Sequence, residues 1–198
     1  SGKVDGVLLK TVSINSKLSK RSDGLYIDPT FEQNYAECKK LGIPVGAYYY
    51  TYAIDRASAD KELALLKTAL AGKTFELPIC VDVEDNKLHK LGRQALTDLT
   101  AYALGVVQNW GFYAMLYTGL YFGNTYLYMG GAALKPYDVW LAAYRDVKPQ
   151  TTFSFGMWQY TSTATVPGIS GNVDLSHAYK DYPSIIRKKG LTRLREGA

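Results

Sequence analysis

The strongest constraint on the fold is a regular alternation along the chain. Short runs rich in β-branched and aromatic residues are separated by segments in which apolar residues recur with helical spacing. Six strand-type runs are clear and a seventh is weaker, at residues 4–12, 43–52, 77–85, 112–119, 138–145, 155–162 and, less clearly, 172–176. This alternation predicts parallel strands joined by crossover helices, and so an α/β fold.

Helices are expected at residues 28–42, 55–70 and 93–109, with a less regular helix or loop at 121–134. The first helix is the most clearly delimited. Asp28 is a typical N-cap residue, Pro29 suits the first helical position, and Gly42 suits the C-terminal end.

The number of strand–helix units in 198 residues favours one domain built as an irregular β/α, TIM-like barrel with some helices reduced. An open, doubly wound sheet fits the same alternation. Neither GxGxxG nor GxxxxGK[ST] follows any strand-type run, which argues against a nucleotide-binding sheet. We therefore favour the barrel.

Several classes of protein are disfavoured by composition. The sequence has no run of 18 apolar residues, so we expect no membrane insertion. Cys38 and Cys80 fall in an expected helix and an expected buried strand, which favours free thiols over a disulfide. His89 and His177 do not have metal-ligand spacing, so we expect no metal and no other cofactor.

The chain is basic, with a formal net charge of +5. This charge favours a polyanionic partner such as nucleic acid, a membrane surface or a Gram-positive cell wall, but it cannot choose among them. Many of the cations fall in two places, at Lys17, Lys20 and Arg21 and in the tail at residues 187–195. Solvated surfaces explain both clusters without any ligand, and we favour that interpretation.

Two acids end the third strand-type run, which reads LPICVDVEDN from Leu77. Because strand side chains alternate between faces, Asp82 and Glu84 should point the same way, with Cys80 behind them. In a barrel, the carboxyl ends of the strands carry the active site. Two close carboxyls do not ionise independently, so one should keep its proton while the other is charged.

An acid beside an anion is what glycosidic bond cleavage requires. The same DxED pattern can also be a solvated strand end. A third acid, Asp174, lies in SGNVDLS, where an Asp near Gly-Asn is often only a turn residue.

Aromatic residues gather at the expected strand ends, and the chain has 17 tyrosines. Aromatic rings stack on sugars while phenol and indole groups hydrogen-bond hydroxyls, although nucleobases stack on the same faces and some rings simply fill a core. The expected cleft residues are Tyr48, Tyr50, Tyr117, Trp140, Tyr144 and Trp158.

Over most of its length the sequence resembles glycoside hydrolase family 25, the Chalaropsis-type lysozymes and phage endolysins. The segments that carry this resemblance are YIDPTFEQNYAECKKLGIPVGAYYYTYA from Tyr26, LPICVDVED, AMLYTG, VWLAAY and MWQYTSTATVPGISGNVDLS. Their order and spacing together are fairly specific.

The resemblance implies an N-acetylmuramidase that cleaves the β-1,4 bond between N-acetylmuramic acid and N-acetylglucosamine in peptidoglycan, without a cofactor. In the family pattern Glu84 matches the general acid, Asp82 its partner and Asp174 a further acid of the cleft. The implied location is extracellular or at the cell wall, as for a phage-encoded protein released at lysis, with peptidoglycan and not nucleic acid as the partner. A separate wall-binding domain would lie outside this chain.

The sequence departs from the family pattern at its start. Family members begin with a strand bearing a DVSxxQ-like motif and an active-site Asp, whereas Ser1-Gly2-Lys3 leads into what resembles the second strand. We therefore expect the first strand to be missing. A non-catalytic glycan-binding or phage structural module on the same fold is the alternative. We expect a catalytic domain at residues 1–179 and a basic tail or linker helix at 180–198.

Overall fold

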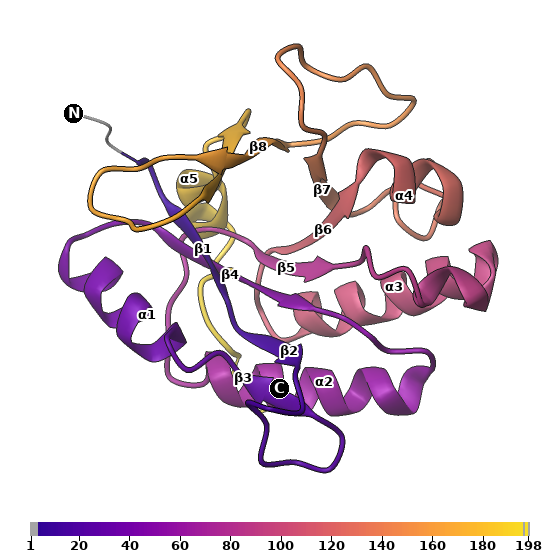
Figure 1. Ribbon diagram of the computed structural model, residues 1–198, viewed down its shortest axis with the longest axis horizontal. Helices are drawn as coiled ribbons and strands as arrows, with labels where there is room; N and C mark the ends of the chain where they lie inside the picture. Colours follow the sequence, from indigo (N-terminus) through magenta and orange to yellow (C-terminus); the bar gives the residue numbers. More distant parts are fainter. Residues whose placement is uncertain (1–3, 196, 198) are drawn as a thin grey trace.

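The computed structural model describes residues 4–195 and 197, and its centre is one curled sheet (Figure 1). The sheet has seven strands in the order β1-β4-β5-β6-β7-β8-β9, of which the first six are parallel and β9 is antiparallel to β8. Their bounds are Val7–Lys10, Val45–Tyr50, Ile79–Asp82, Ala114–Gly119, Asp138–Ala142, Met157–Ala164 and Val173–Ala178. A small antiparallel hairpin pairs β2, Val12–Ile14, with β3, Leu25–Ile27.

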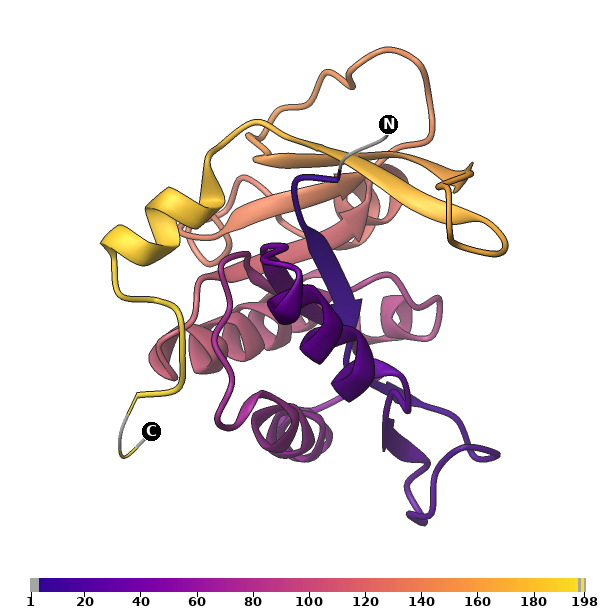
Figure 2. The same cartoon turned by 90° about the vertical axis from the view of Figure 1, so that its left-hand side faces the viewer.

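The helices are α1, α2, α3, α4 and α5, at Phe31–Lys40, Arg56–Leu70, Arg93–Asn109, Leu120–Tyr126 and Tyr182–Lys188, with a 3₁₀ helix η1 at Leu88–Leu91. Figures 1 and 2 show α1, α2 and α3 gathered on one side of the sheet, while α5 lies apart from them. None of the described helices is long and apolar enough to cross a membrane.

The expected elements are largely present, with two local differences. The helix expected from Asp28 begins at Phe31, because Asp28 caps a turn instead: its carboxylate accepts hydrogen bonds from the Thr30 N–H and hydroxyl at 2.9 and 2.6 Å. The run at residues 4–12 divides into β1 and the start of the β2–β3 hairpin, which the sequence analysis did not predict.

The expectation of a TIM-like barrel is too specific. In the described chain β1 and β9 are the two edges of the sheet and do not pair with each other, so the sheet is a curled half-barrel. One cause is the return at the end of the sheet, where β9 runs antiparallel beside β8 in place of a further parallel strand. The missing first strand stays a prediction.

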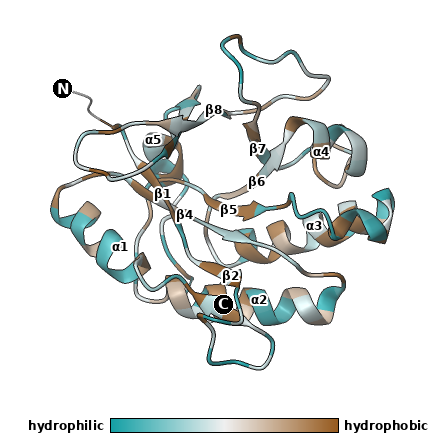
Figure 3. Cartoon of the chain, viewed as in Figure 1, coloured by the Kyte–Doolittle hydropathy of each residue, from teal (hydrophilic) through white to brown (hydrophobic). Residues whose placement is uncertain are grey.

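Alternation along the strands separates two apolar layers. Val81 and Val83 of the β5 region belong to the layer packed under the helices, whereas Cys80 points into the interior of the curl with Met115 and Met157. Figure 3 shows the apolar colour on much of β1 and β5, while apolar and hydrophilic colours alternate along the helices. The expected alternation is confirmed at this strand, and both Cys38 and Cys80 are free thiols.

The C-terminal segment closes the amino-end side of the interior. Tyr182 and Ile186 of α5 are fully buried in the inner layer. The Tyr182 hydroxyl donates a 2.7 Å hydrogen bond to Asp138 at the start of β7, and a Cβ on Gly156 would overlap that hydroxyl. Beyond the helix, the Phe75 N–H donates to the Thr192 carbonyl at 2.8 Å. Residues 180–195 thus pack against the sheet.

Candidate active site

The acids lie at the carboxyl end of β5. This is the end of the sheet interior opposite the one that α5 fills. Asp82 is the last residue of β5 and pairs in register with Tyr50 of β4 and Tyr117 of β6. Glu84 follows two residues later, on the loop that leads to η1. Strand alternation and register therefore bring the carboxylates of Asp82 and Glu84 together with two tyrosines.

Asp82 is a buried acid with an unmet hydrogen-bonding need. It is 4% exposed, and its Oδ1 atom has no hydrogen-bond partner among the described residues. Burial, followed by the charge of Glu84, raises the pKa of Asp82 well above its usual value, while Lys10 acts in the opposite direction. A carboxyl held in this way is poised to bind a group that enters from outside.

Glu84 is half-buried and more accessible than Asp82. Burial raises its pKa first, and the charges of Asp174 and Asp85 raise it further. Glu84 therefore keeps its proton to a higher pH than a free glutamate does. Of Asp82 and Glu84, Glu84 is the one that an incoming ligand can reach.

Asp174 reaches the same region from β9. It is exposed on β9, and partial burial raises its pKa. Its charge acts on Glu84 and also on Tyr48, whose pKa is raised first by burial and then by Asp82, Asp174, Asp28 and Glu84 in turn. The phenol of Tyr48 thus lies among all three candidate acids, which the structure brings together across β5 and β9.

Three aromatic rings form the wall beside the acids. The Trp140 ring lies edge-on to Tyr117 at 4.6 Å and to Tyr48 at 6.2 Å between ring centroids. Its indole N–H donates a 3.0 Å hydrogen bond to Ser176 of β9. Because this bond crosses from β7 to β9, it fixes both the ring and the strand that carries Asp174.

Gln159 of β8 connects two further tyrosines. Its Oε1 atom accepts hydrogen bonds from the hydroxyls of Tyr117 at 2.8 Å and Tyr144 at 3.0 Å. Tyr117 is 6% exposed, whereas Tyr144 is 59% exposed and lies just beyond β7. The buried amide of Gln159 therefore links Tyr117, in the interior, to the solvent-exposed Tyr144.

Tyr50 stands on the other side of Asp82. Its hydroxyl lies 3.4 Å from Asp85 Oδ2, and its ring packs against Tyr52 at 4.8 Å between centroids. Burial raises the pKa of Tyr50, and the charges of Asp85, Glu84 and Asp82 add to this. Tyr50 is therefore in the same acidic cluster as the candidate catalytic residues.

Trp158 is the one expected cleft residue that the structure does not bring to the acids. It lies on the face of β8 opposite Gln159, next to Tyr160 and His177, with ring centroids 5.8 and 5.9 Å away. Its indole N–H donates to the Ala143 carbonyl at 2.8 Å. The physical reason is the two-residue period of the strand, which points neighbouring side chains to opposite faces.

Lys10, Gln159 and Ser176 belong to the site, although the sequence analysis did not select them. Lys10 ends β1, is in register with Tyr48, and its charge lowers the pKa of Asp82. A signal for each was present, because all three are polar residues within or at the end of strand-type runs that otherwise supply the cleft. Within residues 4–195 and 197, no group of three or more His, Cys, Asp or Glu side chains is placed so that it could hold a metal ion.

An α/β sheet that carries buried carboxylates at the carboxyl edge of its parallel strands has the organisation of an enzyme. The family model of the glycosyl hydrolases, family 25, matches residues 2–169, and the chain belongs to this family.

Individual relatives agree with this assignment. The autolytic lysozyme of Clostridium acetobutylicum is 27% identical over 175 residues, covering 88% of this chain and 52% of the relative. The spore cortex lytic enzyme SleM of Clostridium perfringens superposes with a TM-score of 0.70 at 26% identity, over 88% of this chain and 60% of SleM. The CTP1L endolysin has the same fold, with a TM-score of 0.71 at 23% identity over 93% of this chain and 61% of the endolysin. The chain spans about half the length of the curated relatives it matches.

Proposed function

We propose that this chain is an N-acetylmuramidase that hydrolyses the β-1,4 bond between N-acetylmuramic acid and N-acetylglucosamine in bacterial peptidoglycan. Family membership supports the reaction class, and the lysozyme among its relatives supports the substrate. The observation that carries the proposal is the placement of Glu84, half-buried beside Asp82 with a raised pKa, at the carboxyl edge of the sheet.

In the proposed reaction, Glu84 is the general acid. Its carboxyl proton passes to the glycosidic oxygen as the bond from that oxygen to the anomeric carbon breaks. Asp174 supplies negative charge that stabilises the developing oxocarbenium centre, and Asp82 orients the attacking group. A water molecule finally adds its oxygen to the anomeric carbon, and the proton that it releases restores Glu84. Asp82 has the free Oδ1 atom for such an orienting contact.

The proposed substrate-binding residues are Tyr48, Tyr50, Tyr117, Trp140 and Tyr144. Their rings and hydroxyls surround the acids on two sides, and sugar rings stack on aromatic faces while their hydroxyls bond phenols. We propose extracellular or wall-directed action on peptidoglycan, consistent with autolysin and endolysin relatives. The division into a catalytic unit at residues 1–179 and a tail at 180–198 stays a prediction.

The test is release of reducing sugar from purified Gram-positive peptidoglycan by the chain and its Glu84→Gln variant. Glu84→Gln removes the donated proton with almost no change of shape, so we expect activity to fall by about 10²–10⁴-fold while the melting temperature is kept. Glu37→Gln, an exposed glutamate on α1, is the matched control and should remain active. Full activity in Glu84→Gln would refute the assignment. A folded but inactive wild-type chain that binds peptidoglycan would favour a glycan-binding module instead.

A further inference from the structure

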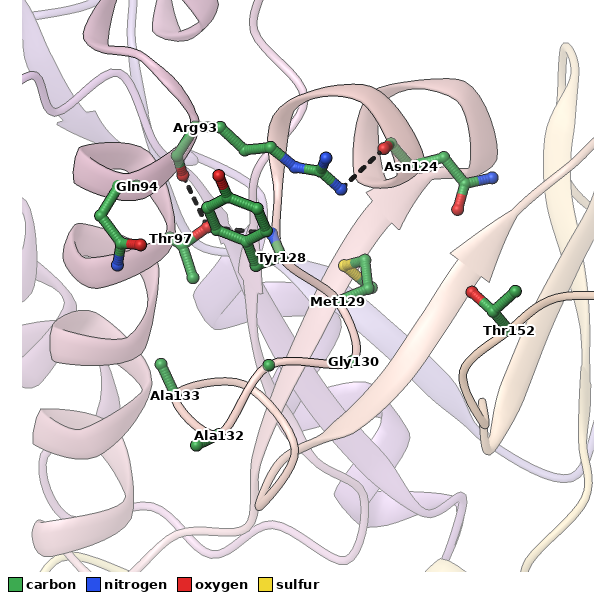
Figure 4. Close-up of a pocket in the computed structure, with 11 residues that line it drawn as sticks. Arg93, Gln94, Thr97, Asn124, Tyr128, Met129, Gly130, Ala132, Ala133 and Thr152 are labelled. Carbon is green, nitrogen blue, oxygen red and sulfur yellow. Dashed lines mark hydrogen bonds between the residues drawn. The ribbon is translucent and has the colours of Figure 1, made fainter.

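A separate hollow of about 630 Å³ lies outside the interior that holds the acids. It is bounded by the first turns of α3, the end of α4 and the loop that follows α4, as Figure 4 shows. None of the candidate catalytic or cleft residues lines it. Its volume is in the range of small-ligand sites.

This pocket lies at the same end of the sheet as the acids. The helix α3 begins after the loop that leaves the carboxyl end of β5, and α4 begins directly where β6 ends. A polymer that is bound at the acids could therefore continue across the rim towards α4.

The pocket wall is rigidly built. The Arg93 guanidinium donates to the carbonyls of Leu127 and Asn124 at 2.8 and 3.0 Å and lies 4.4 Å from the centroid of the Tyr128 ring. The Thr97 hydroxyl accepts the Tyr128 N–H at 3.0 Å. These bonds fix the loop and hold the Tyr128 ring, which is 44% exposed, in the pocket lining.

The remaining polar groups of the pocket are neutral. The side-chain amide of Asn124 and the hydroxyls of Tyr128 and Thr152 have no hydrogen-bond partner among the described residues, and all three side chains are exposed. Arg93 is the one charged lining residue, and three of its hydrogen bonds are already directed to backbone carbonyls. An acidic peptide would find little free charge here, whereas neutral hydroxyls and amides beside an aromatic ring suit a saccharide.

We propose that the pocket at Tyr128 and Asn124 is an accessory saccharide site that holds a second part of the same wall glycan. The proposal rests on the proposed function for its substrate class. A second weak contact on a polymer raises retention through effective concentration, without any change in the chemistry at Glu84. The site would therefore matter for insoluble wall and not for short soluble glycans.

The experiment measures two quantities for the double variant Tyr128→Ala, Asn124→Ala. In the Glu84→Gln background, sedimentation with insoluble peptidoglycan gives binding without cleavage, and we expect binding to weaken roughly tenfold. In the otherwise wild-type chain, cleavage of a soluble peptidoglycan tetrasaccharide should keep its rate while clearing of insoluble wall slows. Tyr121→Ala with Thr125→Ala is the matched control, because both residues lie exposed on α4 and outside the pocket.

Thr152→Val provides a second variant that removes only a hydroxyl from the lining and should weaken binding in the same direction. Binding by the pocket variants equal to that of the control pair would overturn the proposal. A loss of binding on intact wall but not on glycan strands stripped of stem peptides would also overturn it, in favour of a peptide site. Absence of cleavage in the wild-type chain would count against the muramidase and leave the binding comparison interpretable.

Discussion

Asp82 is an ionisable residue at a buried position where folding alone would favour an apolar one. Its folded pKa is raised above the unfolded value, so the folded state binds a proton more tightly than the unfolded chain does. The resulting stability is fully present below the unfolded pKa, near 4, and is lost as pH rises towards the folded pKa. We expect Asp82→Asn, which replaces the buried ionisable group with a neutral amide, to stabilise the fold at pH 7 by about 1 kcal/mol while lowering activity.

Thermal unfolding at pH 7 and pH 4 measures this effect. The stability gain of Asp82→Asn should shrink at pH 4, where the wild-type carboxyl is also largely protonated. Asp146→Asn, which changes an exposed aspartate beyond β7, is the matched control for the substitution itself. An Asp82→Asn variant that is less stable than wild type at pH 7 would contradict the expectation that the buried Asp82 carboxyl lowers the stability of the fold.

Asp174 acts on the proton of Glu84 through its charge. Because this negative charge raises the pKa of Glu84, Asp174→Asn should lower that pKa. The protonated form of Glu84 is then lost at a lower pH, so the alkaline limb of the kcat/KM profile should move towards acid. The measurement is the pH profile on a soluble glycan. An unmoved alkaline limb would show that the charge of Asp174 does not affect the pKa of the general acid.

The sequence predicted the acidic centre better than its surroundings. Asp82 and Glu84 were found because a two-residue period fixes their common face, whatever lies around them. Trp158 lies apart from the acids, and the sequence could not show this because a high density of aromatic residues says nothing about which face of β8 each ring occupies. Gln159 was missed because a single amide in a strand is ordinary in sequence, and its contact with Tyr117 exists only once β6 and β8 lie in the same curl.

Glu62 links two elements, the helix α2 and the end of β4. Its buried carboxyl accepts hydrogen bonds from the Thr51 hydroxyl at 2.6 Å and the Tyr52 N–H at 2.8 Å, directly after Tyr50. Burial raises the pKa of Glu62 to about 7, although both hydrogen bonds lower it. The helix thus positions the strand end that supplies one wall of the site.

The raised pKa of Glu62 makes the contact between α2 and β4 dependent on pH. The folded value of about 7 exceeds the ordinary value of 4.5, so stability from this group is present below pH 4.5 and is lost as pH rises to 7 and beyond. We expect Glu62→Gln to remove this loss, which makes its stability relative to wild type more favourable at pH 8 than at pH 4.5, by about 3 kcal/mol. Urea unfolding at the two pH values measures the difference. The same change in unfolding free energy with pH for both proteins would contradict it.

At the scale of elements, periodicity predicted the helices α2 and α3 and the six parallel strands, because each has its own apolar face. It could not predict that the sheet stays open at β1 and β9. That outcome depends on the antiparallel return of β9 and on long-range pairing, which no local pattern records. The short β2–β3 hairpin was not predicted for the same reason, since its pairing is not recorded in a local pattern.

At the scale of the whole molecule, the candidate acids and the C-terminal segment lie at opposite ends of the sheet interior. The carboxyl ends of the parallel strands carry the acids, while α5 fills the amino-end side (Figure 2). Lys180 and Tyr182 both bond the Asp138 carboxylate at 2.7 Å. The segment after residue 179 therefore contributes to the same core as Cys80, which lies directly behind Asp82.

If this packing matters, a cavity made at α5 should destabilise the whole molecule. Ile186 is fully buried, so Ile186→Ala is expected to cost about 3 kcal/mol of unfolding free energy. Ile185→Ala, at the neighbouring half-buried position, should cost clearly less. Denaturant unfolding followed by tryptophan fluorescence measures both, since Trp140 lies in the same interior layer as Ile186. Equal stability of Ile186→Ala and wild type would mean that residues 180–195 behave as a separate linker, whose removal would leave the catalytic unit intact.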